Sequence, residues 1–68
     1  MADRLGNRLR ELRAERDLTQ AALAELVGVS RKTVNTIENG VFVPSTLLAL
    51  KLARALGEPV EALFFLED

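Results

Sequence analysis

The sequence contains neither cysteine nor histidine. Their absence removes the usual zinc ligands, the thiol nucleophiles and the imidazole bases on which many enzymes depend. We therefore predict no metal site, no cofactor and no catalytic activity.

Long hydrophobic runs are absent as well. No apolar segment approaches the roughly 20 residues of a membrane-spanning helix. The N-terminal sequence MADRLGNRLR also lacks the apolar core of a signal peptide. These absences predict a cytoplasmic protein that has no contact with a membrane.

The chain has no overall excess of basic residues, although such an excess is typical of a nucleic-acid-binding domain. Nine Lys and Arg face ten Asp and Glu, and the net charge is −1. The charge is nevertheless polarised, because residues 1–35 hold seven bases and five acids, whereas residues 36–68 hold two bases and five acids. We expect the first half to face phosphate. The acidic end, which includes Glu58, Glu61, Glu67 and Asp68, would face away from it or toward a partner.

The size of the chain allows one domain, residues 1–68, and there is no repeat, low-complexity tract or linker. A core this small yields only a few kcal/mol of net stability, and oligomerisation is a common supplement. Association between copies would therefore serve stability as well as recognition.

The segment from Gln20 to Asn39, QAALAELVGVSRKTVNTIEN, has the pattern of a helix-turn-helix motif. Ala24 stands where the two helices would cross, and its small side chain lets their axes approach. Gly28 suits the left-handed conformation that ends the first helix, and Ser30 is a good N-cap for the second. The apolar residues that would join the two helices are Leu23, Val27, Val29, Val34 and Ile37.

Ahead of this motif, a helix is predicted for residues 3–15, in which Leu5, Leu9 and Leu12 form the buried stripe. Gly6 is a weak point of that helix. Asp17 marks a reversal of the chain, because aspartate tolerates the left-handed conformation.

The remaining helices are delimited by capping residues. The first helix of the motif starts after Thr19, and the second ends at residues 39–40. Pro44 and Ser45 open a fourth helix that stops at Gly57, and a short fifth helix covers residues 59–65. Phe42 is expected to pack under the bundle, and only the last residues, FFLED, have strand character. The fold class is thus predicted to be all-α, a five-helix bundle.

The exposed face of the motif's second helix carries the functional prediction. At about 100° per residue, Arg31, Lys32, Asn35 and Thr36 lie opposite the buried Val34 and Ile37. Two cations near a helix N-terminus oppose the helix dipole, which suggests that they meet an anion. Duplex DNA fits this requirement. The alternative is an ordinary solvated helix face.

On these residues the chain resembles the Cro/C1-type helix-turn-helix regulators. The resemblance runs from about Leu9 to Phe64, through LRELRAERDLTQAALAELVGVSRKTVNTIENG and PSTLLALKLARALGEPVEALF, and is strongest to the short regulators that consist of little more than the DNA-binding domain. It implies a compact, lambda-repressor-like five-helix bundle. It also implies a homodimeric, sequence-specific regulator, usually a repressor, that places the motif's second helix in the major groove of a palindromic double-stranded operator.

The resemblance also assigns roles to individual residues. Gln20 matches a glutamine whose amide meets a DNA phosphate, and Asn39 matches a position that approaches the phosphate backbone. The positions of the recognition helix correspond to Ser30, Arg31, Lys32, Asn35 and Thr36. Among these, Arg31 and Lys32 are the strongest candidates for reading guanine O6 and N7, the alternative being contacts to phosphate only.

A structural ion pair is implied by the same resemblance. Arg13 lies about 40° from Leu9 around its helix, and Glu38 lies about 40° from Val34, so each borders a buried face. Family members bring these two positions together. We therefore predict that Arg13 and Glu38 form a partly buried pair that holds the two helices.

Some positions depart from the family pattern. Val41 stands where relatives often carry a base, which argues against a phosphate contact from that loop. Leu47, Phe65 and Leu66 extend the apolar surface beyond what one small core needs, and we predict that they form a subunit contact. The alternative is additional packing within one chain.

Two other functions remain open at this point. One is a DNA-binding, antitoxin-like subunit controlled by a protein partner, although the chain has no additional tail for such a partner. The other is a helical protein-interaction module that does not use DNA. With no second domain, no small-molecule effector site is evident.

Overall fold

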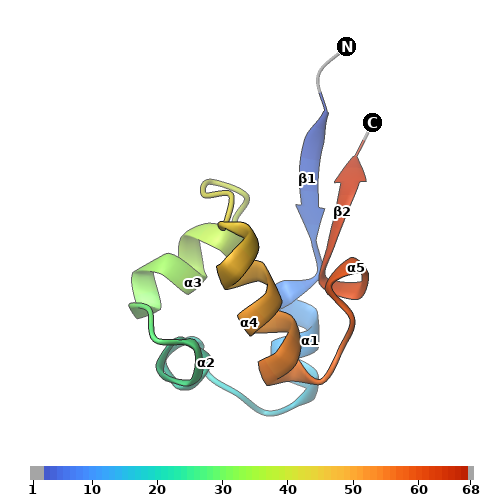
Figure 1. The fold of residues 1–68 in the computed structure, drawn as a ribbon. Coiled ribbons are helices and arrows are strands. Elements are labelled where there is room, and N and C mark those ends of the chain that lie inside the picture. The colour runs from blue at the N-terminus through green and yellow to red at the C-terminus, as the bar shows by residue number, and fades with distance from the viewer. Residues whose placement is uncertain (1–2, 68) are drawn as a thin grey trace.

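In the computed structural model, residues 3–67 are described, and they form five helices and one small sheet (Figure 1). The elements follow the order β1 (Arg4–Asn7), α1 (Leu9–Glu15), α2 (Gln20–Val27), α3 (Arg31–Glu38), α4 (Thr46–Leu56), α5 (Val60–Leu63) and β2 (Phe64–Glu67). The fold is therefore mostly helical and contains the five predicted helices. It is not strictly all-α, because β1 and β2 pair with each other.

The prediction of a helix from residue 3 is wrong. The first part of that segment is β1, which runs antiparallel to β2 with Leu5 opposite Leu66 and Gly6 opposite Phe65. Gly6 disfavours a helix by about 1 kcal/mol relative to alanine. The side chain of Asn7 then accepts a hydrogen bond from the backbone N–H of Leu9 at 3.0 Å, and α1 starts there.

The end of the chain follows the prediction more closely. The segment FFLED, which has strand character within an otherwise all-α prediction, forms β2 over Phe64–Glu67, with Asp68 outside the described residues. The last helix is shorter than predicted and ends at Leu63, because the backbone becomes extended at Phe64 to pair with β1. The backbone N–H of Arg8 also donates to the Leu63 carbonyl at 2.9 Å, which ties the start of α1 to the end of α5.

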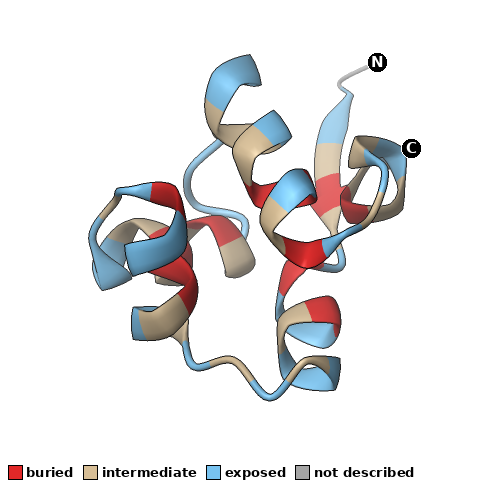
Figure 2. Ribbon diagram, turned by 60° about the horizontal axis from the view of Figure 1, so that its bottom comes forward, coloured by how far each residue is buried: buried red, intermediate tan, exposed pale blue. Residues whose placement is uncertain are grey.

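One core joins all five helices, and Figure 2 shows their buried segments turned toward the interior. Leu9 and Leu12 contribute as predicted, whereas Leu5 lies on β1 and is only partly buried. Ala24 is buried where α2 packs on α3, consistent with its small size. The full core consists of Leu9, Leu12, Leu23, Ala24, Val27, Val34, Ile37, Leu52, Ala53, Leu56 and Leu63.

The predicted helix caps are confirmed. The hydroxyls of Thr19, Ser30 and Ser45 each accept a hydrogen bond from a backbone N–H in the first turn of the helix that follows. Gly28 ends α2 with φ of 76°, in the left-handed region that favours glycine. Asp17 is the one described residue other than glycine with positive φ, at 55°, so the chain does reverse there.

The loop between α3 and α4 differs from the prediction. Phe42 does not pack under the bundle but is 47% exposed. The backbone N–H groups of Val41 and Phe42 both donate to the carbonyl of Thr36, at 2.9 and 3.2 Å. These bonds hold the loop against the end of α3 and leave the Phe42 ring at the surface. Within residues 3–67, no helix has the length and apolar character that crossing a membrane requires.

Candidate nucleic-acid interface

Burial of one side of α3 determines which of its residues face solvent. Val34 and Ile37 are buried in the core, so the opposite side of the helix must face solvent. Arg31 and Lys32 are exposed in the first turn, and Asn35 follows one turn later, partly exposed. This face presents two cations and an amide, the side-chain types that hydrogen-bond to base edges in a major groove.

Two hydroxyls among the predicted site residues are already engaged. The Oγ of Ser30 accepts from the Thr33 backbone N–H at 3.2 Å and lies 3.0 Å from the Thr33 hydroxyl. The hydroxyl of Thr36 donates to the carbonyl of Thr33 at 2.9 Å. Each retains acceptor capacity toward solvent, but their first role here is to shape α3.

Three amide side chains from the predicted set lie together at the end of α3. The Nε2 of Gln20, the first residue of α2, donates to Oε1 of Glu38 at 2.9 Å. The Nδ2 of Asn35 donates to Gln20 Oε1 at the longer distance of 3.4 Å. The Nδ2 of Asn39 donates to the carbonyl of Asn35 at 2.9 Å and to its Oδ1 at 3.1 Å. The fold therefore brings residues from α2 and α3 into one hydrogen-bonded group.

Arg13 and Glu38 lie in contact. Arg13 Nε is 2.6 Å from Glu38 Oε2, with the side chains 15% and 0% exposed. Arg13 also donates to the Leu18 carbonyl at 2.7 Å, which leaves its guanidinium well satisfied. Burial raises the pKa of the Glu38 carboxyl, but hydrogen bonds from Arg13 and Gln20 outweigh burial and hold that pKa below its ordinary value of 4.5.

Arg10 is a member of this group that the sequence reasoning missed. Its Nε lies 3.4 Å from Glu38 Oε1, and its Nη2 donates to Asn39 Oδ1 at 3.1 Å. A signal was present, because Arg10 stands three residues before Arg13 and so lies on the same side of α1. The meeting with Asn39 depends on how α1 packs on α3 and has no sequence signal.

The three residues predicted for a subunit contact do not share one surface. Leu66 stands opposite Leu5 across the sheet, and residues opposite each other point to the same face. Phe65 points to the other face, where its ring covers Gly6. Leu47 is 66% exposed near the start of α4.

An apolar groove lies beside neighbours of two of these residues, because Leu50, one turn after Leu47 on α4, and Leu5, opposite Leu66 in the sheet, both line it. The groove has a volume of about 290 Å³ and is lined by parts of β1, the loop before α4, α4 itself and α5, among them Leu5, Val43, Leu50 and Phe64. Val43 and Leu50 are exposed hydrophobic residues that the sequence reasoning did not select. Their contribution depends on the packing of α4 near the sheet, which brings them to the same groove as Leu5 and Phe64.

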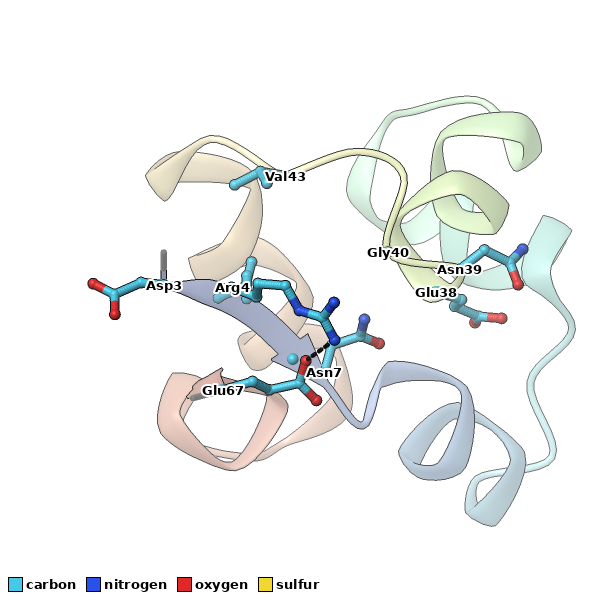
Figure 3. A pocket seen from close by; sticks show the side chains of 10 residues that line it. Asp3, Arg4, Asn7, Glu38, Asn39, Gly40, Val43 and Glu67 are labelled. Carbon is cyan, nitrogen blue, oxygen red and sulfur yellow. Dashed lines mark ion pairs between the residues drawn. The ribbon is translucent and has the colours of Figure 1, made fainter. Parts of the chain in front are cut away.

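A second, more polar cleft of about 580 Å³ lies between β1 and the end of α3 (Figure 3). Charges of both signs line it, and Arg4 Nη2 lies 3.6 Å from Glu67 Oε1 across the sheet. Among residues 3–67, no three acidic, cysteine or histidine side chains gather closely enough to hold a metal ion. We assign no ligand to this cleft.

Known proteins share both the pattern and the fold. The profile of a family described as helix-turn-helix matches residues 9–63, which excludes both strands. The chain belongs to the helix-turn-helix family of DNA-binding transcriptional regulators, Cro/C1 type. This family acts by binding DNA.

Relatives of the same length support that membership. An uncharacterised HTH-type transcriptional regulator of Bacillus subtilis (strain 168), YgzD, is 48% identical over 62 residues, which is 91% of this chain and 94% of YgzD. An uncharacterised HTH-type transcriptional regulator of Methanothermobacter thermautotrophicus is 49% identical over 61 residues, which is 88% of this chain and 88% of that regulator.

A solved structure with 42% sequence identity, the restriction-modification controller protein C.AhdI from Aeromonas hydrophila, superposes with a TM-score of 0.77. The superposition covers 81% of this chain and 83% of C.AhdI. A putative DNA-binding protein from Bacteroides fragilis, 28% identical, has a TM-score of 0.82 over 90% of this chain and 98% of its own. The helix-turn-helix fold is thus shared almost end to end.

Proposed function

We propose that this helix-turn-helix protein is a cytoplasmic, sequence-specific transcription regulator, a repressor that binds a palindromic operator as a homodimer. The observation that carries the proposal is the outer face of α3, on which Arg31, Lys32 and Asn35 face solvent opposite the buried Val34 and Ile37. In a helix-turn-helix domain this is the face that enters the major groove.

Within this proposal the polar residues divide into two groups. Arg31 and Lys32 read base edges, because a guanidinium or an ammonium group donates to guanine O6 and N7. Gln20 positions the domain on phosphate, and Asn39 does so by exchanging the N–H that it donates to the Asn35 carbonyl. Ser30 and Thr36 complete the surface of α3. Gln20 has one amide N–H left for phosphate after its bond to Glu38, together with the free backbone N–H groups at the start of α2.

The homodimer is proposed to form through the apolar groove and through Leu47 and Leu66, which neighbour its lining residues Leu50 and Leu5. Both residues are highly exposed, at 66% and 73%, and a second copy would cover them together with Leu50 and Val43. Phe65 points to the opposite face of the sheet, where its ring covers Gly6, so we expect it to contribute less to this contact. A two-fold axis would then present two α3 helices to half-sites about one helical turn apart, roughly 34 Å.

Repression follows from occupancy, since a dimer seated on a promoter excludes the polymerase from the same DNA. The test is a gel shift with bulk duplex and with the DNA just upstream of this protein's own gene, at several salt concentrations. Phosphate contacts predict binding to both DNAs at low salt that weakens as salt rises, with the specific site retained longest. Absence of binding to any duplex at low salt would favour a protein-interaction module instead.

A further inference from the structure

A closed ring of hydrogen bonds joins five polar side chains. They belong to α1, α2, α3 and the residue that caps the end of α3. Arg10 donates to Asn39 at 3.1 Å, Asn39 to Asn35 at 3.1 Å, Asn35 to Gln20 at 3.4 Å, and Gln20 to Glu38 at 2.9 Å. Arg10 closes the circle through its 3.4 Å contact with Glu38. We call these residues the hydrogen-bond ring.

The two charged members give the ring a direction. A carboxylate only accepts hydrogen bonds, so Gln20 must turn its Nε2 toward Glu38 and its Oε1 toward Asn35. Asn35 must then present Nδ2 to Gln20 and Oδ1 to Asn39. The chain ends at Arg10, which only donates and faces Asn39 Oδ1. Each of the three amides therefore has one orientation that satisfies both neighbours.

The ring leaves Asn35 with a defined pair of unused groups. One N–H and one lone pair of Oδ1 are engaged within the ring, which leaves one N–H and one lone pair free. Asn35 lies on the outer face of α3, four residues after Arg31 and three after Lys32. A free donor beside a free acceptor matches N7 and the N6 amino group of adenine in the major groove.

We propose that Asn35 determines specificity by reading an adenine, and that Glu38 and Arg10 are positioning residues that orient its amide through Gln20 and Asn39. This inference rests on the proposed function, since it requires α3 in the major groove. It specifies the DNA base that one predicted site residue would read. It also gives Glu38 and Arg10 a role in DNA recognition, although neither would face the major groove itself.

Substitution of Arg10 can distinguish this positioning role from a merely structural one. Arg13 already neutralises Glu38 with a close contact, and Arg10 is 61% exposed, so its loss removes little packing. Exposed ion pairs add little stability. What Arg10 supplies that Arg13 does not is the donor to Asn39, which keeps the direction of the ring.

The experiment selects binding sites from duplexes randomised at their centre, using wild type, Asn35→Ala, Arg10→Met and Arg8→Met. Arg8 is the matched control, because it stands directly before α1 and pairs with Glu11 at the surface, outside the ring. A bidentate amide contact favours the right base by roughly 5- to 150-fold. Asn35→Ala should abolish one adenine preference, and Arg10→Met should weaken the same preference by roughly 3- to 10-fold.

Apart from the adenine position, Arg10→Met should have the same base preferences and the same melting temperature as Arg8→Met. Arg10→Lys keeps a hydrogen-bond donor and should therefore restore part of the adenine preference. If wild type selects a site but neither Asn35→Ala nor Arg10→Met changes an adenine position, the inference is overturned while the proposed function stands. A uniform loss over all positions in Arg10→Met would reduce Arg10 to a phosphate contact and also overturn it. Failure of wild type to bind any duplex would overturn the proposed function itself.

Discussion

The ring of Phe65 lies directly over the backbone of Gly6. A Cβ atom placed on Gly6 would stand 2.4 Å from Phe65 Cε2 and 2.7 Å from Cζ. The two residues are opposite each other in the antiparallel pair of β1 and β2, so this contact joins the two ends of the chain. Glycine is required here for close approach, and an aromatic ring over a cross-strand glycine compensates for the missing side chain.

We expect Gly6→Ala to lower the free energy of unfolding by about 1 kcal/mol, because the new methyl group displaces the Phe65 ring and, to a smaller extent, the Glu67 side chain, whose Cδ would lie 2.8 Å away. The cost stays moderate since the clash involves the ends of side chains and not backbone. Urea denaturation measures it. In a Phe65→Ala background the same substitution should cost much less, and an equal cost in both backgrounds would contradict the contact.

Glu38→Gln should lower the melting temperature markedly. The substitution leaves the guanidinium of Arg13 partly buried without its counter-charge, and breaking such a pair costs about 3 to 5 kcal/mol when burial is complete and less where water reaches it. Thermal unfolding is the measurement. Glu11→Gln, at the exposed pair with Arg8, is the control and should change little. An unchanged melting temperature for Glu38→Gln would refute this role.

The pH dependence of stability should also depend on Glu38. Its pKa is lowered in the folded protein, so the carboxylate stabilises the fold above the ordinary pKa of 4.5, and this contribution is lost as pH falls through the lower folded value. Wild type should therefore lose stability in acid more steeply than Glu38→Gln. The check is a series of urea titrations between neutral pH and strongly acidic pH. Parallel curves for the two proteins would contradict the prediction.

Substitutions on the outer face of α3 should distinguish residues that read bases from residues that only bind phosphate. If Arg31 and Lys32 contact base edges, replacing either by Ala should cost about 1 to 3 kcal/mol on the operator and much less on random duplex. Gln20→Ala should weaken both DNAs and leave the salt slope nearly unchanged, because glutamine is uncharged. Losing a cation at a phosphate would reduce that slope by about one unit.

These DNA predictions are tested by titrating each variant against operator and random duplex at several salt concentrations. Equal losses on both DNAs for Arg31→Ala and Lys32→Ala would mean that these two residues only anchor α3. Specificity would then come from Asn35, Thr36 or the shape of the DNA.

If the homodimer forms at the apolar groove, two matched leucine variants should differ in oligomeric state. Leu47→Glu should reduce the sedimentation mass toward that of a monomer and weaken operator binding, because a charge at the contact must be desolvated. Leu26→Glu is the control, since Leu26 is comparably exposed, at 62%, but lies on α2, whereas Leu47 lies on α4 beside Leu50, which lines the groove. Phe65→Glu should have a smaller effect, because Phe65 points to the opposite face of the sheet. Dimeric Leu47→Glu would place the subunit contact elsewhere.

Local features of this protein were determined by the sequence alone. Thr19, Ser30 and Ser45 cap helices through hydrogen bonds to residues three positions away, and Gly28 and Gly57 end helices through their own backbone angles. The helix-turn-helix was predictable for the same reason, because its two helices are short, adjacent and joined by such caps. Interactions of this range are encoded in neighbouring residues.

Tertiary structure decided what depends on residues far apart in the chain. Segment 4–7 is a strand because β2, about sixty residues later, supplies its partner, and its own residues would otherwise continue a helical pattern. The opposite directions of Phe65 and Leu66 likewise appear only once the register of that pair exists. The contact from Arg10 to Asn39 requires α1 to pack on α3. Side-chain type states what a residue can bind, but the packing of distant elements determines which partner it reaches.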